Sequence, residues 1–347
     1  MSSGATLPAE TVPALSVRRI FRADERAGTL PPSLADVLAR SSAAEMVDAV
    51  GLRAAPGAVR AAARAAFSLA SAPIGRVLAR FDARIATHGI AAASASALAD
   101  FGAEWTCDRA VPVCGPLLVV SNHPGAYDAL ALLAALGRRD VAIVAHDRSF
   151  LRALPALSPH LLFVPEAGSG TEPSARAIGA RRALRHLAAG GALLHFGAGR
   201  IEPDPDFFPD VERAAGLSSR APHGPLAPWL DGTGLLVRGA ARCRGRVVAA
   251  VVGGVHSRRA KRSLAARIAE RRGITTLAPL LQIALAYRDV RVRLRVSESA
   301  SAGALAAGAT DAAITARVRS MALDLLGRWS SPMPAGMLGS HRATSAT

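Results

Sequence analysis

From about residue 110 onward, short apolar runs alternate with stretches in which apolar residues recur every three or four positions. The runs have the length of buried strands, and the intervening periodicity is that of one helix face. The strands are expected at residues 116–121, 141–145, 161–164, 192–196, 246–252 and 290–296, and the helices at 126–136, 174–189 and 310–328. Strands that alternate with helices predict an α/β fold with a mixed, largely parallel sheet flanked by helices.

Between residues 36 and 100 the pattern is helical, and its clearest segment has a start signal at Ser71 and Pro73. Apolar residues then follow at helical spacing, at Ile74, Val77, Leu78, Phe81 and Ile85. A second stripe of the same segment carries Arg76, Arg80 and Arg84. A basic amphipathic helix either packs its apolar stripe on its own domain or lies on an anionic bilayer, and both readings stay open.

The chain is expected to divide into four parts. They are a flexible lead at 1–35, a helical N-terminal extension at 36–105, the α/β domain at 106–329 and a disordered tail at 330–347. Residues 202–224 of the domain are rich in Pro, Asp and Gly and predict a long loop. A long loop in a compact domain is often functional.

The composition is that of a globular protein with a strong surplus of arginine. Half of the 347 residues are hydrophobic, which excludes a disordered chain. The net charge is +16, and Lys261 is the only lysine. Guanidinium groups bind phosphate and carboxylate as planar forks, so anionic partners are expected. The three tryptophans are scattered and form no stacking platform, so nucleic acid is not the expected partner.

Several classes of segment and site are not indicated. No secretory signal is apparent, and no window reaches the roughly 18 apolar residues of a membrane span. The three cysteines form no disulfide framework, and no cluster has the spacing of metal ligands, so neither a metal nor a bound cofactor is expected. A cytoplasmic protein, peripheral on the inner face of the cell membrane, is the expected form.

The stretch VVSNHPGAYDALALLAAL, residues 119–136, carries the best candidate chemistry. A predicted strand ends at Ser121, a Pro-Gly turn follows, and a helix is expected to begin near Gly125. His123 is thereby placed at the carboxyl end of a strand, where ligands bind in open α/β sheets, and Asp128 in the first helical turn. The carboxylate can reach back, hold the imidazole in one tautomer and raise its basicity. The pattern predicts a histidine-carboxylate dyad without a protein nucleophile.

NHPGAYD resembles the first motif, NHxxxxD, of the glycerolipid acyltransferase superfamily. About seventy residues later, GGALLHFGAGRIEPDP at 190–205 resembles that family's FPEGTRS strand and turn, or its FPAG variant. VVAAVVGGVHS at 247–257 resembles a later strand with a Val-Pro-Val or Val-Pro-Ile element. The resemblance covers roughly residues 100–300, with the motifs in the family's order.

The resemblance implies an O-acyltransferase of glycerolipid metabolism. His123 would be the general base that deprotonates the acceptor hydroxyl, and Asp128 would orient it. The hydroxyl would attack an acyl thioester directly, so acyl-CoA or acyl carrier protein would be the donor and a lysophospholipid-like or other glycerolipid the acceptor. Asn122 and Gly125 would contact substrate, and backbone N–H groups after Gly125 are candidate donors to the oxyanion.

The second motif departs from the family's pattern. Gly197, Ala198, Arg200 and Ile201 stand where the family has Pro, Glu, Thr and Arg, whereas Gly199 is kept. The family's phosphate-binding arginine is therefore missing at its usual place. Arg200, one residue earlier, is expected to supply a guanidinium, and the two glycines to let backbone amides approach an anion. The alternative is a glycine-rich turn with a solvated arginine.

Two other functions fit the same residues. A thioesterase-like hydrolase would use the dyad to activate water in place of a lipid hydroxyl. A catalytically inactive basic scaffold that binds membranes would account for the altered second motif, although it has no chemical need for the dyad.

Overall fold

The computed structural model describes residues 33–52, 54–125, 127–165, 173–207, 226–271, 281–283, 285 and 287–331. From Leu34 onward, the described residues form one compact unit. Nearly all of the expected lead, most of the expected loop at 202–224 and all but the first two residues of the expected tail lie outside the described residues.

Eight strands of the described chain form one mixed sheet, in the order β1-β7-β6-β2-β5-β3-β4, with β8 paired to β6. They are β1 (Glu104–Cys107), β2 (Leu117–Ser121), β3 (Val141–His146), β4 (Leu161–Val164), β5 (Ala192–Phe196), β6 (Arg246–Gly253), β7 (Arg291–Val296) and β8 (Ala300–Ser301). All neighbouring pairs are parallel except β6 with β7 and β6 with β8. The predicted mixed, largely parallel sheet is confirmed.

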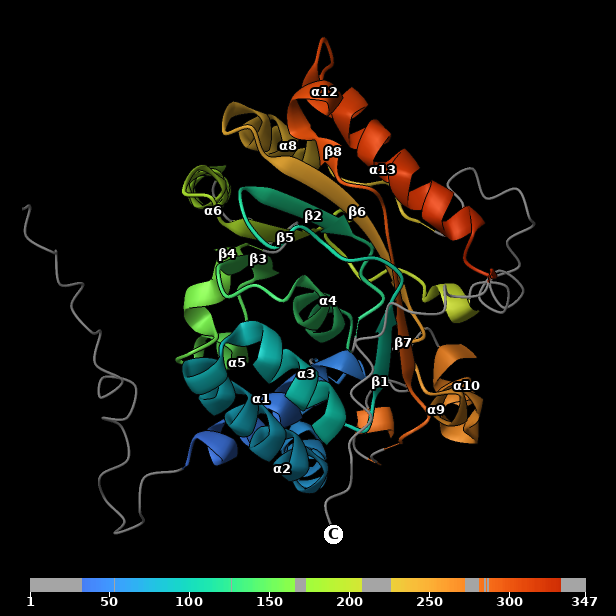
Figure 1. Ribbon diagram of the computed structural model, residues 1–347. Helices are drawn as coiled ribbons and strands as arrows, with labels where there is room; N and C mark the ends of the chain where they lie inside the picture. Colours follow the sequence, from blue (N-terminus) through green and yellow to red (C-terminus); the bar gives the residue numbers. More distant parts are fainter. Residues whose placement is uncertain are drawn as a thin grey trace, which may run out of the picture. The chain divides into compact units, whose positions relative to one another are not determined.

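Helices cover both faces of this sheet (Figure 1). One layer contains α1 (Leu34–Ala49), α2 (Gly57–His88), α3 (Ile90–Asp100) and α4 (Asp128–Leu136), and the other α6 (Pro173–Ala188), α8 (Gly232–Arg242), α12 (Ala302–Ala306) and α13 (Asp311–Gly327). Along β2, Leu117 and Val119 belong to the first core, whereas Leu118 and Val120 belong to the second. A strand covered on both faces is apolar throughout, which is why the central strands could be read from the sequence.

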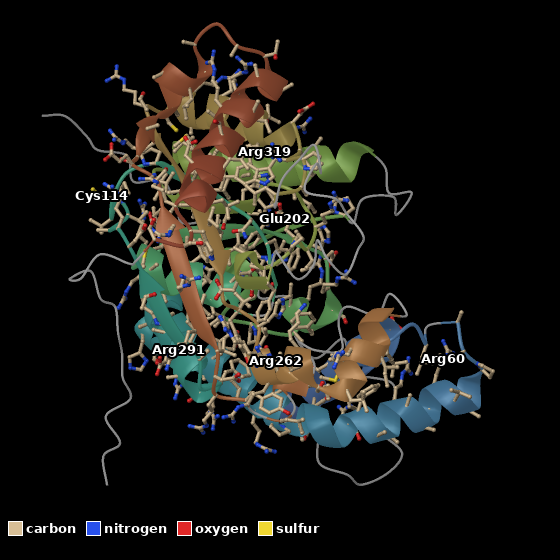
Figure 2. The ribbon with its side chains drawn as sticks, turned by 90° about the vertical axis from the view of Figure 1, so that its right-hand side faces the viewer. Arg60, Cys114, Glu202, Arg262, Arg291 and Arg319 are labelled. Carbon is tan, nitrogen blue, oxygen red and sulfur yellow. The ribbon has the colours of Figure 1, made fainter. Side chains whose placement is uncertain are left out.

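The start of α2 was predicted wrongly. The helix begins at Gly57 and runs through Pro73 without a break, because it packs along α1. At Gly75 the two helices approach so closely that a Cβ atom would lie 2.2 Å from the Ala35 carbonyl oxygen. Figure 2 shows the first turns of α2, with Arg60, projecting beyond the neighbouring elements.

The apolar stripe of α2 packs on the chain's own core. Ile74, Val77, Phe81 and Ile85 are buried, and Leu78 is half-buried. Two arginines of the second stripe pair with Asp100 at the end of α3, at 2.7 Å from Arg84 and 3.5 Å from Arg80. Of the two readings of this helix, the structure supports docking within the domain.

Other boundaries differ by small amounts. The sheet begins at Glu104, inside the predicted helical extension, because β1 pairs with β7 at the sheet edge. The short helices α9 (Arg258–Arg262) and α10 (Leu264–Arg271) follow β6, where no helix was predicted. Among the described residues, no helix combines the length and the apolar character needed to cross a bilayer.

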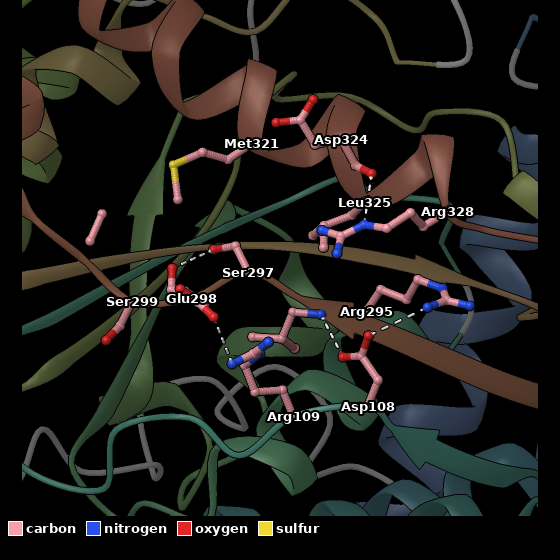
Figure 3. A pocket seen from close by; sticks show the side chains of 12 residues that line it. Asp108, Arg109, Arg295, Ser297, Glu298, Ser299, Met321, Asp324, Leu325 and Arg328 are labelled. Atoms are coloured by element: carbon pink, nitrogen blue, oxygen red, sulfur yellow. Dashed lines mark hydrogen bonds and ion pairs between the residues drawn. The ribbon is translucent and has the colours of Figure 1, made fainter. Parts of the chain in front are cut away.

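A cavity of about 530 Å³ lies at the edge of the sheet where β6 begins and β7 ends (Figure 3). Its charged residues are largely paired with one another: Arg109 lies 3.3 Å from Glu298, and Arg295 lies 3.7 Å from Asp108. The dyad lies at the opposite edge, so this cavity belongs to the scaffold rather than to the candidate site.

Candidate active site

The candidate site lies at the sheet edge where the parallel strands β2, β5 and β6 end. Ser121 at the end of β2 is paired with Phe196 of β5 and with Ala250 of β6. The turn after β2 carries His123 and Asp128 and is termed the dyad turn. The turn after β5, residues 197–202, is termed the glycine turn. The parallel sheet therefore brings the first two sequence motifs to one edge, and His123 follows the carboxyl end of a strand, as predicted.

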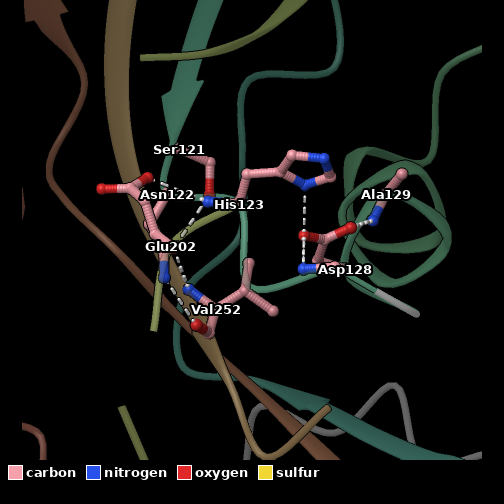
Figure 4. Close-up of polar contacts among 8 residues, drawn as sticks. Ser121, Asn122, His123, Asp128, Ala129, Glu202 and Val252 are labelled. Atoms are coloured by element: carbon pink, nitrogen blue, oxygen red, sulfur yellow. Dashed lines mark hydrogen bonds and ion pairs between the residues drawn. The ribbon is translucent and has the colours of Figure 1, made fainter. Parts of the chain in front are cut away.

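The predicted dyad is formed (Figure 4). His123 Nδ1 lies 2.7 Å from Asp128 Oδ2, and Asp128 is only 1% exposed. The same carboxylate accepts hydrogen bonds from the backbone N–H of Gly125 at 2.8 Å and of Ala129 at 2.6 Å. These bonds fix the carboxylate from three directions, so it holds the imidazole in one orientation.

One face of the His123 imidazole packs against Phe196. The two rings are stacked, with their centroids 4.2 Å apart, and the His123 side chain keeps 29% of its surface exposed. An Nδ1–H that donates to Asp128 leaves Nε2 as the proton acceptor. Burial alone lowers the pKa of His123, but the charges of Asp128 and Glu202 outweigh it, so the pKa lies above its usual value. The arrangement has the chemistry of a general base.

Glu202 is a second acidic residue that contacts the dyad turn. Its Oε2 accepts the backbone N–H of His123 at 3.1 Å, and its own N–H donates to the His123 carbonyl at 2.8 Å. Its Oε1 accepts the N–H of Ala227 at 2.9 Å. Burial raises the pKa of Glu202 to about 7, although both N–H donors favour the ionised form. The Glu202 carboxylate thus connects the backbone of His123 to the glycine turn and to Ala227.

Residues 202–207 run along the sheet edge and are termed the strap. Asp204, 3% exposed, accepts N–H groups of Gly254 at 2.8 Å, His256 at 3.2 Å and Asp206 at 3.0 Å. Asp206 accepts the Trp329 indole N–H at 2.9 Å and pairs with Arg293. The strap therefore ties the ends of β5 and β6 to the start of β7 and the end of α13.

Asn122 and Gly125, expected to bind substrate, make contacts within the chain. Asn122 is fully buried, and its amide donates to the Val252 carbonyl at 2.9 Å and accepts the Val252 N–H at 2.7 Å, which joins β2 to β6. Gly125 has a φ of 86°, which favours glycine, and its N–H is held by Asp128. The N–H groups of Gly125, Asp128 and Ala129 are all engaged internally, so these candidate oxyanion donors are occupied.

The glycine turn has an inner and an outer side. Gly197 lies against Trp229, whose ring would be 2.3 Å from an added Cβ, and Gly199 lies against Leu230 with a φ of 60°. Arg200 is exposed and has no ion-pair partner among the described residues. Ile201, 64% exposed, stands beside Gly125. The turn thus carries one exposed guanidinium and places an exposed apolar side chain beside the dyad turn.

Three residues of this region were not predicted as part of the site: Phe196, Glu202 and Asp204. The sequence places Phe196 at the end of a predicted strand, which is the one signal for its position beside His123.

His195 and His256 were expected to be packed, and burial lowers the pKa of each to about 4. Among the described residues, no group of three or more His, Cys, Asp or Glu side chains is placed to hold a metal ion.

Comparisons with known proteins give distant structural similarity only. No protein-family model and no curated sequence matches the chain. Among solved structures, the chain is similar to the 1-acyl-sn-glycerophosphate (LPA) acyltransferase PlsC from Thermotoga maritima, with 14% identity over 86% of this chain and 98% of that chain and a TM-score of 0.41.

Proposed function

We propose that this protein is an acyltransferase that moves a fatty acyl group from acyl-CoA or acyl carrier protein to the hydroxyl of a lysophospholipid-like or other glycerolipid acceptor. The observation that carries the proposal is the 2.7 Å contact between His123 Nδ1 and the buried Asp128 carboxylate, with the imidazole still open to solvent. The NHxxxxD resemblance supplies the reaction class.

In the proposed reaction, His123 Nε2 removes the proton of the acceptor hydroxyl as its oxygen attacks the thioester carbonyl carbon. The new C–O bond forms, the C–S bond breaks, and the proton held by His123 passes to the thiolate leaving group. Asp128 stabilises the imidazolium that forms in between. No acyl-enzyme is needed, because the acceptor itself is the nucleophile.

The glycine turn supports an acceptor with a polar or anionic head group. Arg200 is free to pair with an anion, and exposed apolar surface is offered by Ile201 beside the dyad turn and by Leu230 beside Gly199. The basic charge of the whole chain favours encounter with acidic donors such as acyl-CoA. The protein would act in the cytoplasm, as a peripheral protein on the inner face of the cell membrane.

The test is thiol release from palmitoyl-CoA by the purified protein, with and without a panel of lysolipids, for wild type, His123→Ala and Asp128→Ala. Release that requires a lysolipid and disappears in both variants supports the proposal and identifies the acceptor. Release without any acceptor, lost in the same variants, would replace it with the thioesterase-like hydrolase. Absence of release from both CoA and carrier-protein donors would overturn it in favour of the inactive scaffold.

A further inference from the structure

The α9–α10 segment, residues 258–271, leaves the sheet directly after the candidate site. Its inner side is anchored: Ser257 caps α9 by accepting the Ala260 N–H at 3.1 Å and donates to Asp289 at 2.6 Å. Ala260 and Ala266 are buried. Figure 1 shows α9 and α10 beside β7, outside the helix layers that cover the sheet. The segment therefore has one packed side and one side without a partner in the described fold.

The outer side carries two large apolar residues. Leu264 is 72% exposed and Ile268 is 43% exposed. They lie four residues apart on α10, so their side chains share one face. Of the large apolar side chains in the described part of the chain, only Val113 is more exposed than Leu264. Paired apolar side chains in water indicate a contact surface rather than a solvated helix face.

Unpaired positive charge borders this apolar pair. Residues 258–271 contain six basic residues and one acidic residue, Glu270. Arg258, Arg262 and Arg267 are exposed, and none forms an ion pair with another described residue. By comparison, Arg152 and Arg238 are each paired with a carboxylate. An apolar pair between arginines fits the interface of a bilayer with anionic head groups.

The segment is joined to the candidate site by the strap. Lys261 places its ammonium group 5.5 Å from the centroid of the Phe207 ring, and Phe207 lies at the far end of the strap that begins at Glu202. Ile201 and Leu230, also exposed, contact the two turns of the site itself. Apolar side chains are thus exposed both at the dyad and along the neighbouring segment.

We propose that the α9–α10 segment docks the protein on an anionic phospholipid bilayer, with Leu264 and Ile268 inserted below the head groups and the arginines among the lipid phosphates. This inference deepens the proposed function, on which its meaning for catalysis rests, since a lipid acceptor would reside in that bilayer. Binding to the bilayer depends on the segment alone and can be measured without catalytic turnover.

Two other basic surfaces compete for this role. The apolar stripe of α2 is buried in the core and is not available to lipid. Helix α6 carries the exposed Arg181, Arg182 and Arg185 but a single exposed large apolar residue, Ile178. Because α6 has similar charge without an apolar pair, it is the matched control that separates a docking site from the effect of net charge.

The experiment is co-sedimentation of the full chain with phosphatidylcholine vesicles, with and without phosphatidylglycerol. Leu264→Ser/Ile268→Ser is expected to weaken binding to the anionic vesicles about tenfold. Arg262→Glu/Arg267→Glu is expected to weaken it about tenfold or more at low salt, with a smaller loss at high salt. Arg181→Glu/Arg182→Glu and Ile178→Ser are expected to stay within about twofold of wild type. Equal losses in the segment and α6 charge variants, or wild-type binding by the segment variants, would overturn the inference.

A second measurement does not depend on comparing folded variants. Leu264→Cys, labelled with an environment-sensitive fluorophore in a Cys114→Ser background, should shift to the blue on anionic vesicles, whereas labelled Ile178→Cys should not. A shift at both positions or at neither would contradict the proposal.

The docking proposal and the proposed function can fail separately. Vesicle binding through the segment by a protein without acyl transfer would leave the docking proposal standing and overturn the proposed function. Acyl transfer to a detergent-dispersed acceptor by a protein that does not bind vesicles would support the proposed function and overturn the docking proposal.

Discussion

The dyad turn and the glycine turn stand at the ends of neighbouring parallel strands, but their polar groups are used differently. In the dyad turn, the carboxylate of Asp128 has three donors, and the amide of Asn122 is fully engaged with β6. In the glycine turn, Arg200 and Ile201 are exposed, and the Glu202 carboxylate is buried. The polar groups of the first turn are held in place within the fold, whereas the second turn has exposed side chains that a ligand could contact.

If the proposed function holds, this difference predicts separate tasks for the two turns. A general base must be held in one geometry, since small displacements of a reacting group reduce the rate strongly. Selection of an acceptor instead needs side chains that face the ligand, and the glycine turn is where this chain departs from the family's motif. Changes in the dyad turn should therefore affect kcat, whereas changes on the outer side of the glycine turn should affect KM.

The largest effect is expected for Asp128→Asn. The variant keeps the size of the side chain but removes the charge that orients and stabilises the His123 imidazolium. We expect kcat/KM for acyl transfer to fall by about 10²- to 10⁴-fold. The control is Asp100→Asn, which removes a carboxylate paired with Arg84 at the end of α3. Equal activity in Asp128→Asn and wild type would refute the role of the dyad.

Glu202→Gln tests the hydrogen bonds by which the glycine turn holds the backbone of the dyad turn. The carboxylate accepts a backbone N–H on each oxygen, whereas an amide has one acceptor oxygen, so one of the two N–H groups would face an NH₂ group. We expect kcat to fall by about 10- to 100-fold and the free energy of unfolding to drop by about 1–3 kcal/mol.

Activity and chemical denaturation measure the two effects of Glu202→Gln. Glu298→Gln, at the opposite edge of the sheet and paired with Arg109, serves as the matched variant. If Glu202→Gln lost stability without any change in kcat, the residue would be structural, and its proposed positioning of His123 would be wrong.

The contrast between the turns also shows what the sequence could reveal. His123 and Asp128 are five residues apart at a strand-to-helix junction, so local geometry alone places them together. The central strands β2 and β6 were predicted because both faces are buried and, apart from Ser121 and Arg246 at their ends, the residues form continuous runs without polar side chains. β1 was missed because an edge strand with the sequence Glu-Trp-Thr-Cys has no such run.

Glu202 was missed for a different reason. Its partner His123 lies 79 residues away, and the contact is made with a backbone N–H, which has no sequence signature. The Glu-Pro-Asp-Pro-Asp run suggested a solvated loop. Prolines hold the residues before them extended, and side chains two apart in an extended chain share one side, which explains why Glu202 and Asp204 are buried together. Their backbone donors come from elements that only the fold brings near.

A smaller effect is expected for Arg200→Ala on the outer side of the glycine turn. Loss of a charge-assisted hydrogen bond should raise KM about tenfold for acceptors with an anionic head group and leave kcat unchanged. Neutral acceptors should be unaffected. Arg182→Ala on α6 controls for the loss of one exposed positive charge. A matching rise in KM for neutral and anionic acceptors, or a fall in kcat, would contradict the separation of tasks between the turns.

The smallest effect concerns the pH dependence of kcat/KM. The base must be neutral, so activity should rise with pH through the pKa of His123, which the charges of Asp128 and Glu202 raise above its usual value. Glu202 itself titrates near pH 7, so the acid limb of wild type should involve both groups. Glu202→Gln removes one charge that favours the imidazolium. The rise of kcat/KM on the acid side should therefore move to lower pH and fit the titration of a single group. Activity profiles normalised to their alkaline plateau measure this shift. A limb that stayed in place in Glu202→Gln would mean that the glycine turn holds the backbone of His123 without influencing the charge of its ring.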